Sequence, residues 1–497
     1  MARDRRFEAG ARGQTACAAD SAHAEGVVAQ AGERLRRATA AAARKARALG
    51  RPVLASLTAS LPPLDPLDVF GRSIPAARSL MLWARPADRF SLVGVDSAWA
   101  FTTDGPDRFT RASAAWQRVR DQGVACGAEA GPWGAGPVAL GAFSFSPQPT
   151  GGALWDGYPA GVLVVPRLSV TTTREGTWFT LAVMADASQT SSTLDDEVGT
   201  SLDLVANALG SGPPAEAGRR GSGDLVMIEE FPPAEAWKAT VAAAARAVRE
   251  GPFRKIVLSR GLRVRAGRLD PIEILRTLRA DYPACTVFAV TRGGQCFLGA
   301  TPERLVRVRG GEVHVAAIAG SAPRGLTEEE DGRLGAALLA SVKDQVEHAV
   351  VVDALRDALA PVCTSISVGA APVLFKIRNV QHLHTPLSAR LRGSPTVLEL
   401  ADLLHPTPAV GGVPREEAVR WIARHEGWDR GWYAGTIGWM DRAGEGECAV
   451  AIRSALLRGS EAFLFAGCGI MAVSDPDEEY AESSLKLRAV LSALTGS

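Results

Sequence analysis

The sequence lacks several features that would place it in a functional class at once. Its seven cysteines are scattered and form no CxxC pair, which argues against a disulfide framework or a zinc site and suits a reducing compartment. No apolar run approaches the roughly 18 residues of a membrane span. Lys and Arg together number 55 against 54 Asp and Glu, and this balance gives no support for nucleic acid or an anionic membrane as a partner. The sequence therefore predicts a soluble, cytoplasmic protein.

Motifs of the common nucleotide-binding and hydrolase sites are also missing. The chain contains no Walker GKS/T sequence, no GxGxxG after a strand, no GxSxG and no HExxH. Nucleotide-binding, serine-hydrolase and zinc-hydrolase functions therefore have no local support. The hydrophobic fraction of 46% and the charged fraction of 22% are ordinary for a globular protein that buries a large core.

Composition divides the chain into a short leader and one long body. We expect residues 1–24 to be disordered and residues 25–497 to form a single domain, with an amphipathic helix at its start. A Pro/Gly/Ser-rich segment at 210–224 is the best candidate linker within it. It separates a variable front half, 25–223, from a core half, 224–497. Short alternating runs punctuated by Gly and Pro predict many antiparallel strands in both halves.

One stretch near the C-terminus, FAGCGIMAVSDPDEEYAESSLKL, combines a strand pattern with an acidic helix start. Glu479 and Glu482 are three residues apart, and Lys486 is four residues further on. Side chains at this spacing share one helix face. Acidic residues at a helix start often do no more than complement the helix dipole, so a functional reading needs a second acidic face.

A second acidic face is present in KDQVEHAVVVDALRDAL, where Asp344 and Glu347 are three residues apart beside apolar positions. A carboxylate next to a core face needs a cation or a donor to offset its desolvation. Paired carboxylates without a thiolate or imidazole cluster favour a hard cation, Mg²⁺ before Ca²⁺. Arg453 has apolar neighbours in a predicted strand, so it must pair with an anion.

Other polar residues carry little information alone. Lys255 begins a predicted strand, where a lysine is usually solvated. Glu303 follows Pro302 in a break between two apolar runs, and His382 alternates with apolar residues on a strand. A histidine there could be a metal ligand or a hydrogen-bonding wall residue.

Together these segments resemble the chorismate-utilising enzymes. The matching stretches cover about residues 225–495 in the same order: KIVLSR, LGATPERL, AIAGSAPRG, KDQVEHAVVVDAL, VQHLHTP, LLHPTPAVGG, GWYAGTIGW, VAIRSALL and FAGCGIMAVSDPDEEYAESSLKL. The upstream stretches GRPVLASLT and PLDPLDVF resemble the front half of isochorismate synthases.

The resemblance implies one α/β (α+β) chorismate-binding domain, in which two large, mainly antiparallel β-sheets pack as layers with helices outside. It also implies a site for Mg²⁺ and chorismate. Glu347 and Glu482 match metal-binding glutamates, with Asp344 and Glu479 in the same acidic patch. The positions that match the substrate pocket are Gly320, Ser321, His382, Tyr433, Arg453, Gly467 and Lys486.

Two positions sort the chemistry within the family. Lys255 together with Ala319 resembles the water-adding branch, in which Lys255 would act as general base and Glu303 as general acid. The resemblance therefore implies an isomerase, isochorismate synthase of the menaquinone or siderophore type, working as a monomer without a glutaminase subunit. A salicylate synthase, which goes on to eliminate pyruvate, and a non-catalytic chorismate-binding protein are the alternatives.

Overall fold

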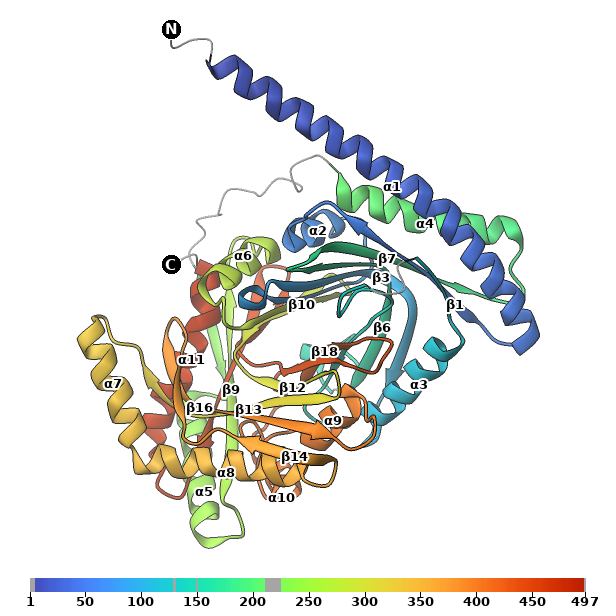
Figure 1. The fold of residues 1–497 in the computed structure, drawn as a ribbon. Coiled ribbons are helices and arrows are strands. Elements are labelled where there is room, and N and C mark those ends of the chain that lie inside the picture. Colours follow the sequence, from blue (N-terminus) through green and yellow to red (C-terminus); the bar gives the residue numbers. More distant parts are fainter. Residues whose placement is uncertain (1–4, 128–130, 149–150, 211–224, 496–497) are drawn as a thin grey trace.

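The computed structural model describes residues 5–127, 131–148, 151–210 and 225–495, with side chains from residue 26 onward. The boundary expected between the front and core halves, at 223/224, lies outside the described residues. Helices line the outside of the molecule, and α1 runs beside α4 (Figure 1). The α-helices are α1 (Arg5–Leu49), α2 (Pro66–Ser73), α3 (Arg108–Gln122), α4 (Ser191–Leu209), α5 (Ala234–Glu250), α6 (Pro271–Asp281), α7 (Glu328–Ala340), α8 (Val342–Leu359), α9 (Val397–Leu404), α10 (Arg415–His425) and α11 (Pro476–Thr495), with short 3-10 turns η1 (Pro86–Asp88) and η2 (Ala153–Trp155).

Strands make up the interior. The front half contributes β1 (Val53–Leu61), β2 (Leu80–Arg85), β3 (Phe90–Thr103), β4 (Val124–Gly127), β5 (Ala139–Phe143), β6 (Gly161–Thr173) and β7 (Gly176–Ala185). The core half contributes β8 (Val226–Phe231), β9 (Lys255–Arg265), β10 (Thr286–Arg292), β11 (Gln295–Thr301), β12 (Arg304–Arg309), β13 (Glu312–Pro323), β14 (Cys363–Val368), β15 (Val373–Lys376), β16 (Val380–Leu391), β17 (Gly412–Val413), β18 (Thr436–Met440), β19 (Gly446–Val450), β20 (Ser454–Arg458) and β21 (Glu461–Ile470).

Hydrogen-bonded pairing joins these described strands into one continuous, mainly antiparallel network. Strands of the two halves alternate within it, since β10 pairs with β2 and β18 pairs with β5. The pairing of β1 with β4 is parallel. The mixed α/β architecture with a large, mainly antiparallel sheet and outer helices is therefore confirmed, and the described strands belong to one connected sheet.

Alternating side chains on the strands pack into two hydrophobic cores. On β2, Leu82 joins an outer core that also contains Phe70 of α2 and Leu275 of α6. The next residue, Trp83, joins an inner core that contains Trp439 of β18. Successive side chains of a strand point to opposite faces, so a strand such as β2 contributes to both cores. Burial of each large apolar side chain contributes about 1.5–3 kcal/mol, and both faces of the sheet are stabilised in this way.

Two capping contacts fix the register of the acidic helix α8. Thr327 accepts a hydrogen bond from the Glu330 amide at the start of α7, as its sequence position predicts. Ser341 then ends α7, and its side chain accepts from the Asp344 amide to begin α8. The acidic segment is therefore two tandem helices, and Glu347 lies one turn after Asp344.

The start of α11 is fixed in a similar manner. The Asp475 carboxylate accepts hydrogen bonds from the amides of Asp477 and Glu478 at 2.9 and 3.1 Å. With this start, Glu479 is buried and Glu478 is exposed to solvent. Glu478 is therefore the exposed neighbour of a buried glutamate on this helix.

Two findings concern the class of protein rather than its functional site. Within the described ranges, no helix combines the length and apolar character that crossing a bilayer demands. The cysteines whose side chains are described are all free thiols.

We predict that Gly261→Ala destabilises the protein. Gly261 lies in β9, and a Cβ there would approach the Phe231 ring to 2.0 Å. Overpacking of this kind costs about 1–3 kcal/mol. Gly332→Ala in α7 is the matched control, because a Cβ at Gly332 meets nothing within 4 Å and alanine favours a helix by about 0.5–1 kcal/mol. Urea unfolding measures both variants, and an unchanged free energy of unfolding for Gly261→Ala would contradict the packing.

Candidate active site

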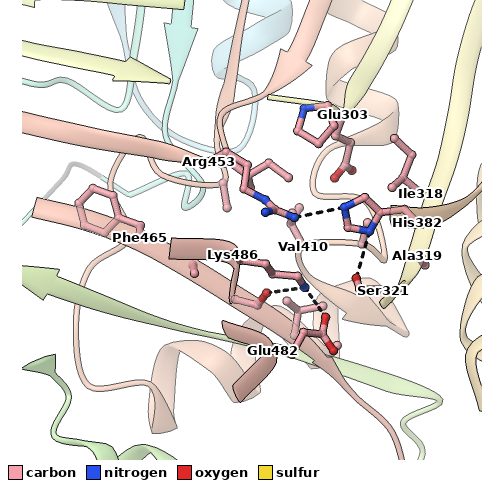
Figure 2. A pocket seen from close by; sticks show the side chains of 18 of the residues that line it. Glu303, Ile318, Ala319, Ser321, His382, Val410, Arg453, Phe465, Glu482 and Lys486 are labelled. Atoms are coloured by element: carbon pink, nitrogen blue, oxygen red, sulfur yellow. Dashed lines mark hydrogen bonds and ion pairs between the residues drawn. The ribbon is translucent and has the colours of Figure 1, made fainter. Parts of the chain in front are cut away.

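Most of the predicted site residues line one cavity of about 70 Å³ in the core half (Figure 2). They come from strands β9, β13, β16 and β21, from helices α8 and α11, and from the turns between strands. The predicted residues in the lining are Lys255, Glu303, Gly320, Ser321, Glu347, His382, Tyr433, Arg453, Gly467, Glu482 and Lys486, and Ala319 lies among them. The two other predicted residues, Asp344 and Glu479, lie outside the lining.

An ion pair joins the sheet to α8 at one end of this cavity. The Nζ of Lys255 lies 2.8 Å from Oε1 of Glu347, and the Lys255 side chain is 1% exposed. Lys255 begins β9, and β9 pairs with β21 so that Gly469 stands beside Val257. A Cβ at Gly469 would lie 2.3 Å from Lys255 Cε and 2.5 Å from Glu347 Oε1. Glycine at 469 therefore leaves the space that the ion pair occupies.

Glu303 lies in the break between β11 and β12, where the sequence predicts it. Its side chain is 5% exposed, and its Oε1 accepts a hydrogen bond from the Thr407 hydroxyl at 3.1 Å. Burial raises the pKa of Glu303 to about 7, although Thr407 and the charge of Lys255 oppose the rise. A carboxyl group with this pKa carries a proton in a substantial fraction of molecules at neutral pH.

The ring of His382 lies between strand β13 and Arg453, and it is neutral. A bulge after Ala319 places Ser321 opposite His382 across β13 and β16. Nδ1 of His382 lies 3.0 Å from the Ser321 hydroxyl and 3.2 Å from the Gly320 carbonyl, while Nε2 lies 3.2 Å from Nη2 of Arg453 (Figure 2). Arg453 is a donor, so Nε2 accepts and the ring proton is on Nδ1. Burial and the positive charge of Arg453 lower the pKa of His382 to about 3, in agreement with a neutral ring.

Arg453 does not lie inside a strand, contrary to the sequence-based expectation. It lies immediately before β20, and its φ of 52° places it in the left-handed region. The side chain is buried, and Nη1 has no hydrogen-bond partner among the described residues. Burial also lowers the pKa of its guanidinium. Arg453 therefore offers a buried donor to an anion in the cavity.

Helix α11 contributes a second ion pair to the lining. Nζ of Lys486 lies 2.5 Å from Oε1 of Glu482 and donates to the Gly467 carbonyl at 3.0 Å (Figure 2). Burial acts to raise the pKa of Glu482, but the Lys486 charge outweighs it and keeps the pKa below the usual range. Lys486 thus connects α11 to the strand that carries Gly467.

The acidic patch beside Glu482 has properties suited to a cation. Glu479 is 2% exposed, and its Oε1 accepts from Ser474 and from Lys343, at 2.7 and 3.1 Å. Its Oε2 is buried and has no hydrogen-bond partner among the described side chains. Burial and the Glu482 charge raise the pKa of Glu479. An orphaned carboxylate oxygen next to another carboxylate is a plausible metal ligand.

Asp344 belongs to the same patch. Burial raises its pKa, and the charges of Glu347 and Glu482 raise it further. Ligand atoms of Cys468, Glu479 and Glu482 also lie within 4.8 Å of one another. Because Mg²⁺ prefers carboxylate oxygen to sulfur, the residues present fit a hard cation through their glutamates.

Sequence reasoning missed several residues that hold the site in place. Thr407, the partner of Glu303, lies in the HPTPAVGG stretch, whose two prolines mark a rigid loop. Arg430 lines the cavity and binds Glu426 through two contacts, at 2.6 and 2.7 Å. Glu426 in turn accepts from the amide and hydroxyl of Ser259. Two charged residues four apart near a helix end give no sign in sequence that both are buried.

Tyr433 forms part of the wall behind these ion pairs. Its side chain is 3% exposed, and burial raises the pKa of its hydroxyl. The ring lies 5.2 Å from that of Phe465 in β21 and 6.2 Å from that of Trp428. Aromatic packing of this kind fixes the shape of the cavity at the Gly467 side.

We predict that Glu303→Gln gains stability relative to the native protein as pH rises. The folded-state pKa of about 7 exceeds the usual 4.5, so the native fold loses stability as pH rises through this interval. Across this interval, the free energy of unfolding of the native protein falls by about 3 kcal/mol. Urea unfolding of both proteins at about pH 5 and pH 8 measures it, with Glu478→Gln as an exposed control. An equal effect of Glu303→Gln at both pH values would show that the Glu303 pKa is not raised.

Comparison with known proteins agrees with this geometry. Residues 38–495 match the family described as "Chorismate binding enzyme". The salicylate biosynthesis isochorismate synthase of Pseudomonas aeruginosa is 39% identical over 456 residues, covering 91% of this chain and 92% of that protein. Isochorismate synthase MenF of Bacillus subtilis is 35% identical over 458 residues, covering 91% and 96%.

A solved structure supports the fold. The menaquinone-specific isochorismate synthase MenF of Escherichia coli superimposes with a TM-score of 0.73 at 24% identity, covering 89% of this chain and 95% of that chain. The family match and the two relatives extend over both the front and core halves. The protein is therefore an enzyme of the chorismate-binding family.

Proposed function

We propose that the enzyme converts chorismate to isochorismate. The observation that carries the proposal is that Lys255 and Glu303 line one cavity from separate elements, with Ala319 in the same lining. In the reaction, water adds to carbon 2 of the ring and the hydroxyl at carbon 4 leaves, while the double bonds shift between them. One water enters and one leaves, so the overall change is an isomerisation. The names of the two relatives support this choice.

Lys255 is the proposed general base. It would take a proton from the water that attacks carbon 2, and its almost complete burial excludes competing solvent. Nζ of Lys255 lies 2.8 Å from Oε1 of Glu347, so this contact must open before Lys255 can take a proton from water. A cation held by Glu347 would replace Lys255 as its partner.

Glu303 is the proposed general acid. Its pKa of about 7 leaves a proton to donate to the departing hydroxyl at neutral pH. The Thr407 hydroxyl bonds to Oε1 and so fixes the orientation of the carboxyl group. After turnover, the proton gained by Lys255 and the proton lost by Glu303 return through exchange with solvent.

Two other cations in the same lining, Arg453 and Lys486, would bind the substrate carboxylates. Nη1 of Arg453 is a buried donor without a partner among the residues that the structure describes. Lys486 adds a charged donor held by Glu482 and Gly467. Chorismate carries two carboxylates, which need charge-assisted hydrogen bonds once they leave water. The neutral His382 keeps Arg453 in position without adding a competing charge.

Mg²⁺ is the proposed cofactor. Glu347 and Glu482 would hold it, with Glu479 and Asp344 beside them, and the bound ion would supply neutralisation of a substrate carboxylate. The raised pKa values of Glu479 and Asp344 show how unfavourably these carboxylates share the patch without a cation. We also propose that the enzyme acts as a monomer without a glutaminase subunit, since the reaction adds water rather than ammonia.

The first test is product analysis. Purified protein incubated with chorismate and Mg²⁺ is expected to form isochorismate, identified by chromatography. Salicylate together with pyruvate would instead identify a salicylate synthase, and unchanged chorismate would identify a non-catalytic binding protein. Either outcome contradicts the proposal.

The second test is a pair of variants on one helix. Glu482→Ala removes a proposed metal ligand and the partner of Lys486, and we expect at least a 10³-fold fall in kcat/KM, an order of magnitude typical of losing essential charge stabilisation. Glu478→Ala, four residues earlier and exposed, should change kcat/KM by less than about twofold. Initial rates at saturating Mg²⁺ measure both, and comparable losses in the two variants would contradict the helix assignment.

Lys255→Ala should abolish turnover, and unchanged turnover would exclude the base role.

A further inference from the structure

A second cavity, of about 280 Å³, lies away from the active site and shares no lining residue with it. It is formed by the turn between β2 and β3, the turn between β6 and β7, the segment around Trp133, and strands β12 and β19. Its lining is unusual in charge, because five arginines contribute to it: Arg85, Arg89, Arg174, Arg307 and Arg309. No role in the proposed reaction accounts for this concentration of cations.

Carboxylates neutralise one part of this cavity. Glu447 is 1% exposed, and its Oε1 lies 3.2 Å from Nη1 of Arg85 and 2.6 Å from Nε of Arg304. Arg85 also binds Asp88 at 2.7 Å. Asp88 and Glu447 are therefore engaged with Arg85 and Arg304, and the third carboxylate of the lining, Glu175, is exposed to solvent.

Arg307 and Arg309 form a close pair of cations in this lining. They are two residues apart on β12, so both point to one face of the strand. Their guanidinium carbons lie 4.8 and 5.2 Å from the centroid of the Trp133 ring. Neither forms an ion pair with a carboxylate in the part of the chain that the structure describes. Two cations therefore converge on one aromatic ring, and their mutual repulsion is unfavourable.

Hydrogen-bond donors in the same place also lack acceptors. Nε of Arg307 and Nε1 of Trp133 are both buried without a partner among the described residues. Burial lowers the pKa of Arg307, and the positive charges of Arg304 and Arg309 act in the same direction against Glu447. A buried donor without an acceptor is unfavourable. Arg307 and Trp133 both line the cavity, so an anion bound there would lie beside these donors.

We propose that this cavity is a second ligand site, which binds a compact anion with at least two negative charges through Arg307 and Arg309. Arg89 and Arg174 are exposed at the rim, where they would attract the anion and complete its coordination. A phosphate or phosphomonoester and a small dicarboxylate share this chemistry. Guanidinium groups bind the oxygens of both in a bidentate manner.

The position of the site connects it to the catalytic cavity. Strand β12, labelled in Figure 1, begins at Arg304, directly after Glu303 in the sequence, and ends at Arg309. The proposed anion therefore binds at one end of a six-residue strand whose other end adjoins the proposed general acid. The proposal itself concerns binding, so it stands or fails independently of the reaction that the enzyme catalyses.

The test is a titration of the full-length protein with inorganic phosphate and, separately, with succinate. Isothermal calorimetry and thermal unfolding are followed against sodium chloride of equal ionic strength. The native protein should bind one of the two anions and unfold at higher temperature, whereas chloride should have no matching effect. Tighter binding of phosphate identifies a phosphoryl ligand, and tighter binding of succinate identifies a dicarboxylate.

Variants locate the binding. Arg307→Ala with Arg309→Ala should weaken the affinity about tenfold or more, because two charge-assisted contacts are lost. Arg309→Ala alone removes an exposed side chain, so it retains the fold and should still weaken binding severalfold. Arg246→Ala, an exposed arginine of α5, is the control and should bind as the native protein does. Unaltered binding by Arg309→Ala and by the double variant, or no binding beyond chloride, would overturn the proposal.

Discussion

The ion pair between Lys255 and Glu347 is the contact on which the cavity depends. It holds α8 against the first residue of β9, in space that Gly469 leaves open. Breaking a buried pair by removing one partner typically costs 3–5 kcal/mol, so this contact stabilises the fold as well as the site. The proposed base and a proposed metal ligand are thus each other's partners before any ligand binds. Ligand binding must exchange this pair for new partners, rather than fill a site that is already prepared.

Local features of the fold are readable from the sequence, whereas its long-range pairing is not. The apolar spacing of Trp237, Val241 and Val248 predicts the buried face of α5, and Thr327 predicts the start of α7. Both follow from contacts within a few residues. The pairing of β10 with β2 joins strands about two hundred positions apart. Such pairing depends on which faces pack together, and a single sequence does not encode it in any local pattern.

The candidate site likewise contains some features that the sequence predicts and others that it does not. The two acidic faces could be predicted because a spacing of three residues on a helix fixes their direction. The buried pair of Glu426 and Arg430 could not, since two opposite charges four residues apart just after a helix are usually a solvated surface pair of small energetic value. The bond from Thr407 to Glu303 joins two loops, and only the folded chain brings them together. The family resemblance supplied roles for residues whose local sequence is ordinary.

Arg453 has a consequence for any attempt to stabilise this enzyme. Its left-handed backbone costs on the order of 1–3 kcal/mol in a residue other than glycine, and its buried Nη1 has no hydrogen-bond partner within the described parts of the chain. Selection of variants for heat resistance alone would favour replacement of this residue, glycine above all. The most heat-resistant variants would then be those that have lost the donor best placed for a ligand. Thermal stability and ligand affinity are opposed at this one position, so a screen for one must also measure the other.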